Sequence, residues 1–259
     1  MAKIVVLVKQ VPDVEAVRID PRTSEPDVAG AGLKVSDYDK NAVEAAVQLK
    51  EKNAGSRVVA LSLGGPKVEE SLKETLAMGC DEAVVLRDPA FEKADTAEKA
   101  RLLALAVAKI GGVDLVIGAE ESADSHSAQT GPRVAEHLGW GLVAYVTSLK
   151  LEGGKVIAER DIDEGIDVVE GATPLVLTVT ESLNEPRLPA LMHILQAKNK
   201  PVKVMSAADL GAGDVKPLLA RTRNVAPKQE RKQQMIPVES PEKAADDLVK
   251  ILVKEGVIG

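Results

Sequence analysis

The stretch VDLVIGAEESADSHSAQTGPRVAEHL, residues 113–138, decides the fold, because it contains a strand pattern, a polar loop and a helix pattern in succession. Its opening apolar run, followed by Gly118, is typical of a buried parallel strand. After the loop, Ala128, Gly131, Ala135 and Leu138 recur at helical spacing on one face. The stretch therefore predicts one βα unit with hydroxyls and carboxylates at its joint.

The polar joint, residues 120–127, fits a nucleotide phosphate. The N–H groups at the start of a helix are unpaired and the helix dipole is positive there, so both attract an anion. Ser127 and Thr130 add hydroxyl donors, and Gly131 lets the backbone approach closely. The competing interpretation is that Ser127 only caps the helix and that the loop is a surface turn. This stretch alone leaves both interpretations open.

The composition indicates an α/β protein with a substantial core. A chain of 259 residues has room for one large domain or two small ones. Its formal net charge of −7 argues against nucleic acid as the main partner. It lacks an apolar run of about 18 residues, so we expect no transmembrane segment, and its N-terminus resembles a strand rather than a signal peptide. The single cysteine, Cys80, fits a buried thiol in a reducing compartment, so we expect a cytoplasmic protein.

Strand and helix patterns alternate along the first half of the chain. This alternation predicts a doubly wound, mostly parallel, Rossmann-like sheet, whose ligands bind beyond the carboxyl ends of the strands. We therefore expect the joints after Val8, Leu63 and Gly118 to face one crevice. The predicted strands span residues 3–8, 57–63, 82–86 and 113–117, and the predicted helices span 40–52, with Ser36 or Asp37 as N-cap, 68–78, 96–110 and 128–138.

The second half of the chain is rich in strand patterns and ends in a tail. We expect a domain over residues 1–205 and a C-terminal arm over residues 206–259 that lies on another chain, because the arm has little core of its own. The patterns predict a hairpin over 142–151 and 155–161, strands at 167–170 and 175–180, a turn at 184–189, a short helix at 190–198, a Lys/Arg/Gln-rich segment at 226–234 and an amphipathic helix at 241–254.

The sequence contains no standard catalytic or metal motif. One cysteine and three scattered histidines give no zinc spacing, and neither the dinucleotide fingerprint nor the P-loop is present. Asp124, Ser125 and His126 have the composition of a catalytic triad, but sequence neighbours rarely point at one another in that geometry. We therefore expect no catalytic side chain and no metal ligand. The residues by themselves predict nucleotide binding.

Three stretches together resemble the β subunits of electron transfer flavoproteins. Residues 37–52 are similar to the loop and helix that follow the first strand in that family, and residues 124–139 resemble its nucleotide phosphate loop. The third stretch, Asn184-Glu185-Pro186-Arg187 with Leu191 and Lys198, is similar to its recognition loop. Residues 77–81 and 208–211 fit as well, so the resemblance covers nearly the whole chain in the right order.

The resemblance implies a heterodimer with an α subunit that carries the electron-transferring FAD, and a Rossmann-like fold of the adenine nucleotide alpha hydrolase-like kind. It also implies docking to redox partners of the acyl-CoA dehydrogenase or quinone oxidoreductase type. It places the cofactor-binding positions at Leu7, Ser36, Asp37, Tyr38, Asp39, Leu63, Asp124, Ser125, His126, Ser127, Ala128, Gln129 and Thr130. It places the docking positions at Asn184, Glu185, Pro186, Arg187 and Leu191, in a recognition loop over residues 184–200.

The family binds in this subunit either AMP, as a structural nucleotide, or a second FAD in the members that bifurcate electrons from NADH. His126 and Ala128 depart from the AMP-binding pattern, and residues 131–132 and 135–139 are more similar to the flavin-binding branch. We therefore expect FAD, with AMP as the alternative. Two rivals from other classes are a stand-alone adenine-nucleotide-binding protein of the universal stress type and an amidohydrolase-like or synthetase-like enzyme that uses Asp124 and His126.

Overall fold

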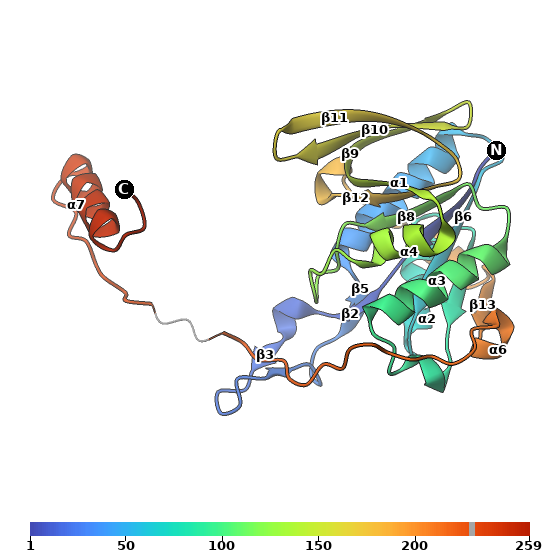
Figure 1. The fold of residues 1–259 in the computed structure, drawn as a ribbon, viewed down its shortest axis with the longest axis horizontal. Coiled ribbons are helices and arrows are strands. Elements are labelled where there is room, and N and C mark those ends of the chain that lie inside the picture. Colours follow the sequence, from blue (N-terminus) through green and yellow to red (C-terminus); the bar gives the residue numbers. More distant parts are fainter. Residues whose placement is uncertain (228–230) are drawn as a thin grey trace.

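A computed structural model describes residues 1–227 and 231–259 of the chain. Its centre is a mixed sheet that, within the described residues, has nine strands in the order β11-β10-β9-β12-β8-β1-β6-β7-β13 (Figure 1). All neighbouring pairs are parallel except those that β10 forms with β9 and β11, so the predicted doubly wound, mostly parallel sheet is confirmed. The strands are β1 (Lys3–Leu7), β6 (Arg57–Leu63), β7 (Glu82–Leu86), β8 (Leu115–Ala119), β9 (Gly141–Glu152), β10 (Lys155–Ile162), β11 (Gly165–Ala172), β12 (Leu175–Val179) and β13 (Val202–Met205).

Helices cover both faces of this sheet. The helices are α1 (Asp37–Lys52), α2 (Val68–Met78), α3 (Thr96–Ile110), α4 (Thr130–Leu138), α5 (Leu191–Ala197), α6 (Ala207–Leu210) and α7 (Pro241–Lys254), with the short 3-10 turns η1 (Val14–Ala16), η2 (Pro89–Phe91) and η3 (Glu181–Leu183). The segment between β1 and α1 forms two small antiparallel ribbons, β2 (Gln10–Pro12) with β5 (Leu33–Val35) and β3 (Arg18–Ile19) with β4 (Pro26–Asp27).

Alternate residues of the central strand build two separate cores. Ile4 and Val6 of β1 pack with the apolar residues of α1 and α2, whereas Val5 and Leu7 pack with those of α3 and α4. Because β1 is covered on both faces, its sequence is a continuous apolar run rather than an alternating one. Each such side chain stabilises the fold by roughly 1.5–3 kcal/mol relative to an exposed one.

The order of the strands changes direction beside β1. From β1 the chain moves to β6 and then to β7 on one side, and later crosses to β8 on the other side. The helices after β1 and β6 therefore lie on one face and those after β7 and β8 on the other. A reversal of this kind opens a crevice beyond the carboxyl ends of the two strands, where ligands of doubly wound sheets bind. In this chain the reversal lies between β1 and β8.

The single thiol lies at the end of α2. Gly79 follows the helix with a φ of 133°, and a Cβ at this position would come within 2.8 Å of Val47. Only glycine therefore fits this turn without strain. Cys80, the next residue, is fully buried, and burial raises the pKa of its thiol to about 12. The predicted buried thiol is confirmed.

The predicted hairpin is also confirmed, since β9 and β10 are antiparallel and meet at Gly153 and Gly154. The polypeptide after β13 first packs on the domain: Leu210 and Ala212 are buried in the second core. The chain then passes the β3–β4 ribbon, where the N–H of Ala226 donates to the carbonyl of Ser24, and ends in α7, which stands apart from the sheet in Figure 1. Of the predicted Lys/Arg/Gln-rich segment, residues 228–230 lie outside the described residues.

Candidate nucleotide-binding site and docking loop

The loops after β1 and β8 are joined at the carboxyl edge of the sheet. Lys9, two residues beyond β1, extends its Nζ into the loop after β8, where it donates to Asp124 Oδ1 at 2.6 Å and to Ser122 Oγ at 3.1 Å. The N–H of Ala123 donates to the hydroxyl of Ser36, which is fully buried at the start of α1. The joints after the first and fourth predicted strands therefore meet at the switch point of the sheet.

The loop that follows carries unpaired N–H groups. His126 and Ala128 have φ values of 44° and 51°, in the left-handed region. Within the described part of the chain, the N–H groups of Ser127, Ala128 and Gln129 have no hydrogen-bond acceptor. Successive free N–H groups next to left-handed residues form an anion-binding concavity, and the positive end of α4 adjoins this one.

The start of α4 corrects one prediction and excludes the competing interpretation of Ser127 as the helix cap. Ser127 is not the N-cap, because the helix begins at Thr130 and its N-cap is Gln129, which makes no side-chain cap hydrogen bond. Ala128, predicted to be the first residue of the helical face, lies in the loop instead. The helical spacing of Ala128 is therefore accidental.

Gly131 allows a close approach, but to the neighbouring strand. A Cβ at Gly131 would lie 2.3 Å from Cγ2 of Thr178, a buried residue of β12. The glycine thus sets the distance between the first turn of α4 and the sheet. By this contact it also fixes where the free N–H groups of the loop lie.

Asp39 is a buried carboxyl at the first turn of α1. Its Oδ2 accepts the N–H of Lys9 at 2.7 Å, which ties the end of β1 to α1. Burial raises the pKa of Asp39 to about 7, against the opposing effect of that hydrogen bond and of the Lys9 charge. Ser36 occupies the predicted N-cap position, although its hydroxyl serves Ala123 rather than the helix. Asp37 is exposed and pairs with Lys34 and Lys40.

The structure does not assemble Asp124, Ser125 and His126 into a triad. His126 Nδ1 lies 2.6 Å from Glu121 Oε1, whereas Asp124 pairs with Lys9 and Ser125 Oγ lies 3.0 Å from Ser122 Oγ. The His126 ring meets Tyr38 edge to face, with 5.9 Å between ring centroids. That contact places Tyr38, at the start of α1, beside the loop between β8 and α4.

The remaining two predicted positions are apolar. Leu7 is buried in the second core next to Gly118, and Leu63 is a half-buried residue at the end of β6. Sequence reasoning missed Lys9 and Ser122, which hold the loop in place. The sequence signal for Lys9 was its position as a cationic residue directly after the apolar run of the first strand.

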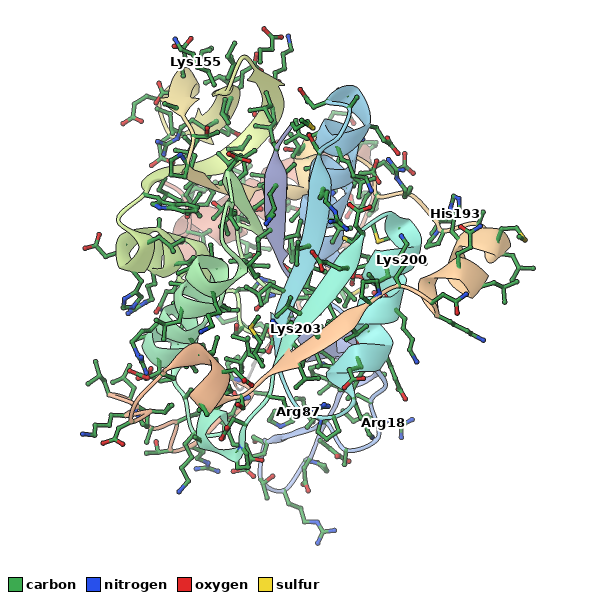
Figure 2. All side chains as sticks on the ribbon, turned by 90° about the vertical axis from the view of Figure 1, so that its right-hand side faces the viewer. Arg18, Arg87, Lys155, His193, Lys200 and Lys203 are labelled. Atoms are coloured by element: carbon green, nitrogen blue, oxygen red, sulfur yellow. The ribbon has the colours of Figure 1, made fainter. Side chains whose placement is uncertain are left out.

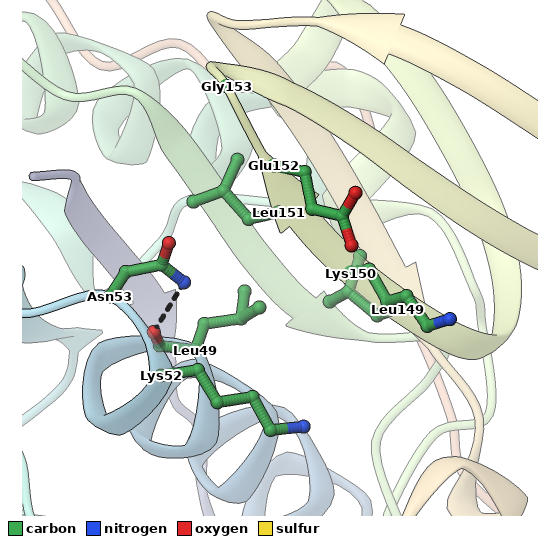
Figure 3. Close-up of a pocket in the computed structure, with 8 residues that line it drawn as sticks. All are labelled: Leu49, Lys52, Asn53, Leu149, Lys150, Leu151, Glu152 and Gly153. Carbon is green, nitrogen blue, oxygen red and sulfur yellow. Dashed lines mark hydrogen bonds between the residues drawn. The ribbon is translucent and has the colours of Figure 1, made fainter.

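Two surface hollows lie away from this site, at the amino-terminal edge of the parallel strands. The larger, of about 540 Å³, separates the end of α1 from the β9–β10 turn and is lined by Leu49, Lys52, Asn53 and residues 149–153 (Figure 3). The other, of about 300 Å³, is lined by Met1, Asp114 and neighbouring residues. None of the predicted cofactor-binding residues lines either of them.

The predicted docking residues lie on a separate surface. Asn184, Pro186 and Arg187 are half-buried against α1, whereas Glu185 is exposed. Leu191, the first residue of α5, is 71% exposed, and Leu188 and Met192 beside it are also exposed. Figure 2 shows this helix, with His193 labelled, projecting from the rest of the molecule. The structure therefore presents an apolar group on a short helix beyond a polar, well-packed turn.

The parallel sheet and the loop at its switch point define a Rossmann-like protein of the nucleotide-binding class. The family model of the electron transfer flavoprotein domain matches residues 28–210. The chain is 42% identical to an electron transfer flavoprotein subunit beta of Thermoanaerobacterium thermosaccharolyticum, over 80% of this chain and 79% of the relative. It is 37% identical, over 81% of this chain and 80% of the relative, to the caffeyl-CoA reductase-Etf complex subunit CarD of Acetobacterium woodii. The identity to an electron transfer flavoprotein subunit beta of Mycobacterium tuberculosis is 35%, over 82% and 81%.

The chain belongs to the β-subunit family of electron transfer flavoproteins. Membership implies an α-subunit partner and binding of a flavin or nucleotide. Across the described ranges, no helix is long and apolar enough to cross a membrane, and no group of three or more His, Cys, Asp or Glu side chains could hold a metal ion.

Proposed function

We propose that this β subunit binds FAD at the joint between β1 and β8. The observation that carries the proposal is the run of unpaired N–H groups at residues 127–129, directly ahead of α4 and at the switch point of the sheet. These groups fit a phosphate of the adenosine half of the cofactor. The hydroxyl of Thr130 adds a donor at the first residue of α4.

The chain's own residues bind and orient the cofactor. Lys9 holds the loop through Asp124, Ser36 holds it through Ala123, and Tyr38 packs against His126. The bound flavin would supply the redox chemistry, since flavins carry hydride and electrons that side chains do not. The family resemblance assigns cofactor binding also to Leu7, Asp37, Asp39, Leu63, Ser125, Ser127, Ala128, Gln129 and Thr130.

We further propose that the heterodimer oxidises NADH and divides the electrons between a high-potential and a low-potential acceptor. The support is the sequence of the predicted phosphate loop, in which His126 and Ala128 depart from the AMP-binding pattern, together with the resemblance of residues 131–132 and 135–139 to the flavin-binding branch. The second candidate is a structural AMP site in a non-bifurcating electron shuttle. It rests on the same backbone donors, because AMP and FAD share an adenosine monophosphate moiety.

The arm and the docking helix complete the proposal. The predicted arm spans residues 206–259; its start packs on this subunit through Leu210 and Ala212, and we propose that its later part lies on the α subunit. The support is α7, none of whose residues is buried. Residues 184–200 dock to redox partners of the acyl-CoA dehydrogenase or quinone oxidoreductase type. The name of the Acetobacterium relative supports the first type, since it places that protein in a complex with a caffeyl-CoA reductase.

The lone, buried cysteine is consistent with function in the cytoplasm.

Release of the bound nucleotide tests the cofactor proposal. The chain is co-expressed with its α subunit, the purified complex is heat-denatured, and FAD and AMP are quantified per heterodimer by chromatography. Two FAD and no AMP is the expected result. One FAD and one AMP would overturn the bifurcating proposal in favour of the structural AMP site. A complex that releases neither nucleotide would overturn both.

A further inference from the structure

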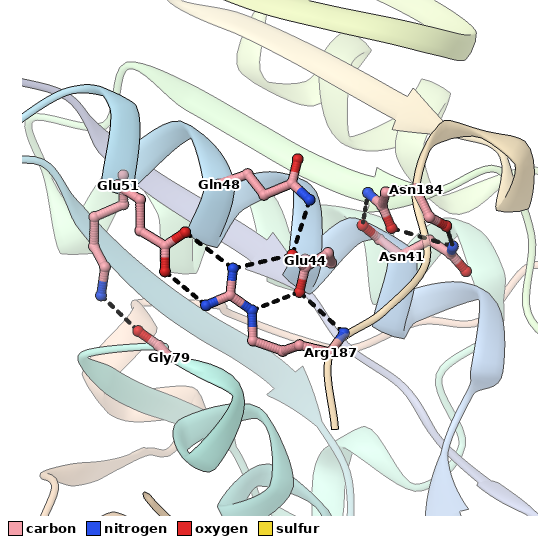
Figure 4. A network of polar contacts seen from close by, with 8 residues as sticks. Asn41, Glu44, Gln48, Glu51, Gly79, Asn184 and Arg187 are labelled. Atoms are coloured by element: carbon pink, nitrogen blue, oxygen red, sulfur yellow. Dashed lines mark hydrogen bonds and ion pairs between the residues drawn. The ribbon is translucent and has the colours of Figure 1, made fainter. Parts of the chain in front are cut away.

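The turn that carries the docking helix is bound to α1 by two sets of polar contacts (Figure 4). Asn41 donates from Nδ2 to the carbonyl of Asn184 at 2.7 Å and to the carbonyl of Glu181 at 3.1 Å. In return, Asn184 donates from Nδ2 to the carbonyl of Asn41 at 3.0 Å. Three residues further along the chain, Arg187 pairs with two carboxylates of the same helix.

The Arg187 guanidinium is used almost completely inside the subunit. Its Nε and Nη2 donate to the two oxygens of Glu44 at 2.7 and 3.0 Å, and its Nη1 and Nη2 donate to the two oxygens of Glu51 at 2.6 and 3.0 Å. The backbone N–H of Arg187 also donates to Glu44 at 3.2 Å. Two bidentate pairs on one planar group give a single allowed geometry.

The burial of Glu44 makes this arrangement more than a surface ion pair. Its side chain is 5% exposed, so the charge needs partners to remain inside the protein. Burial works against that charge, but hydrogen bonds from Arg187 and Gln48 outweigh it and hold the pKa of Glu44 below its usual value. Arg187 is therefore committed to α1, whereas Leu191, four residues later, is exposed.

We infer that Arg187 and Asn41 are positioning residues that fix the docking loop on α1 and so set the affinity of the heterodimer for its dehydrogenase. This inference rests on the proposed docking function of residues 184–200. A loop that is ordered before it meets its partner loses less conformational freedom on binding, so it binds more tightly. The same helix begins at Ser36–Asp39, so α1 also supports the nucleotide joint.

The test is Arg187→Lys in the intact heterodimer, compared with Arg57→Lys at an exposed position at the start of β6. Lysine keeps the charge, but its single ammonium cannot make bidentate pairs with both Glu44 and Glu51. Three quantities are measured: bound nucleotide per heterodimer, hydrogen–deuterium exchange of residues 184–197, and the kinetics of electron transfer with a purified acyl-CoA dehydrogenase and its acyl-CoA substrate. Glu51→Gln is a second variant, at a more exposed carboxyl of the same network.

In Arg187→Lys we expect faster exchange over residues 184–197, and a KM for the dehydrogenase that rises roughly two- to tenfold with unchanged kcat and nucleotide content. Arg57→Lys should change none of these. Unchanged exchange, or faster exchange with an unchanged KM, would overturn the inference. If exchange rises but the wild-type heterodimer itself transfers no electrons with the dehydrogenase, the proposed docking function fails while the role of Arg187 in holding the loop stands.

Discussion

Asp39 is a carboxylic acid that the fold keeps away from water at the start of α1. Its pKa is about 7, against 3.8 for the exposed group, so the folded protein favours the protonated form. Between pH 3.8 and about 7 the native state therefore binds more protons than the unfolded state. The free energy of unfolding consequently falls as the pH rises through this range. The loss is at most about 4 kcal/mol, because each pKa unit corresponds to about 1.4 kcal/mol.

Asp39→Asn should remove this pH dependence. The amide oxygen can still accept the Lys9 N–H, but the side chain never ionises. We expect the melting temperature of the variant heterodimer to exceed that of the wild type at about pH 8, and this difference to shrink as the pH falls towards about 4. Asp37→Asn is the control: two lysines hold the pKa of Asp37 below its usual value in spite of partial burial, so this variant should gain nothing at alkaline pH. A wild-type melting temperature that is flat across this range would contradict the prediction.

Gly131→Ala tests the contact between α4 and β12. The added methyl group would meet Thr178 Cγ2 at 2.3 Å, so the helix or the strand must shift. We expect a loss of about 1–3 kcal/mol in the free energy of unfolding, measured with denaturant. Thr178→Ser removes the opposing methyl group, so the double variant should recover part of that loss. Gly65→Ala, where nothing lies within 4 Å, is the matched control. A destabilisation that Thr178→Ser leaves unchanged would contradict this explanation.

At the scale of the elements, a variant in the loop between β8 and α4 distinguishes a nucleotide-binding role of His126 from a catalytic role. His126 contacts Glu121 and Tyr38, and no triad is formed around it. His126→Ala should therefore weaken nucleotide retention, measured by equilibrium dialysis of the heterodimer, without abolishing electron transfer once nucleotide is supplied. His137→Ala, on an exposed part of α4, should leave retention unchanged. Complete loss of turnover with nucleotide fully bound would instead favour the hypothesis of an amidohydrolase-like or synthetase-like enzyme that uses Asp124 and His126.

The sequence predicted regular elements better than it predicted the loops between them. The bounds of β6, α2, β7, α3 and α7 agree with the predicted ranges, because apolar periodicity and terminal glycines, prolines or acidic residues mark them locally. The start of α4 was wrong, since the left-handed conformations of His126 and Ala128 arise in a loop that Lys9 holds from a distant part of the chain. Local periodicity carries no information about such a contact.

The docking region shows the same limit. The recognition residues 184–187 could be named from the family resemblance, and the short helix after them was predicted. The network around Arg187 could not be predicted, because Glu44 is separated from it by 143 positions and buried carboxylates have no local sequence signature. The fold brings the two together only when α1 and the turn after β12 lie on the same side of the sheet.

At the scale of the whole molecule, we expect the domain to determine the thermal stability and the arm to determine association with the α subunit. Leu210 and Ala212 are buried in the second core, so a truncated variant must retain them to keep the domain intact. The apolar residues of α7 are at least partly exposed, so α7 can be removed without opening the core. Deleting residues 231–259 should therefore leave the melting of the domain nearly unchanged and weaken association with the α subunit, measured by analytical ultracentrifugation. Leu248→Asp on α7 should act in the same direction, and Lys250→Gln, on its exposed face, should not. Undiminished association after the deletion would show that the arm does not lie on the α subunit.

The burial of Cys80 has a practical consequence for fluorescent labelling of the docking helix α5 and of α7. The chain has one cysteine, and it is fully enclosed with its pKa raised to about 12, so a maleimide dye at neutral pH should find no reactive thiolate in the native subunit. A cysteine placed on α5 or α7 would then be the only site labelled in this subunit, without removal of the natural one. Fluorescence from such a label could report the docking helix and the arm separately, each against an otherwise unmodified β subunit.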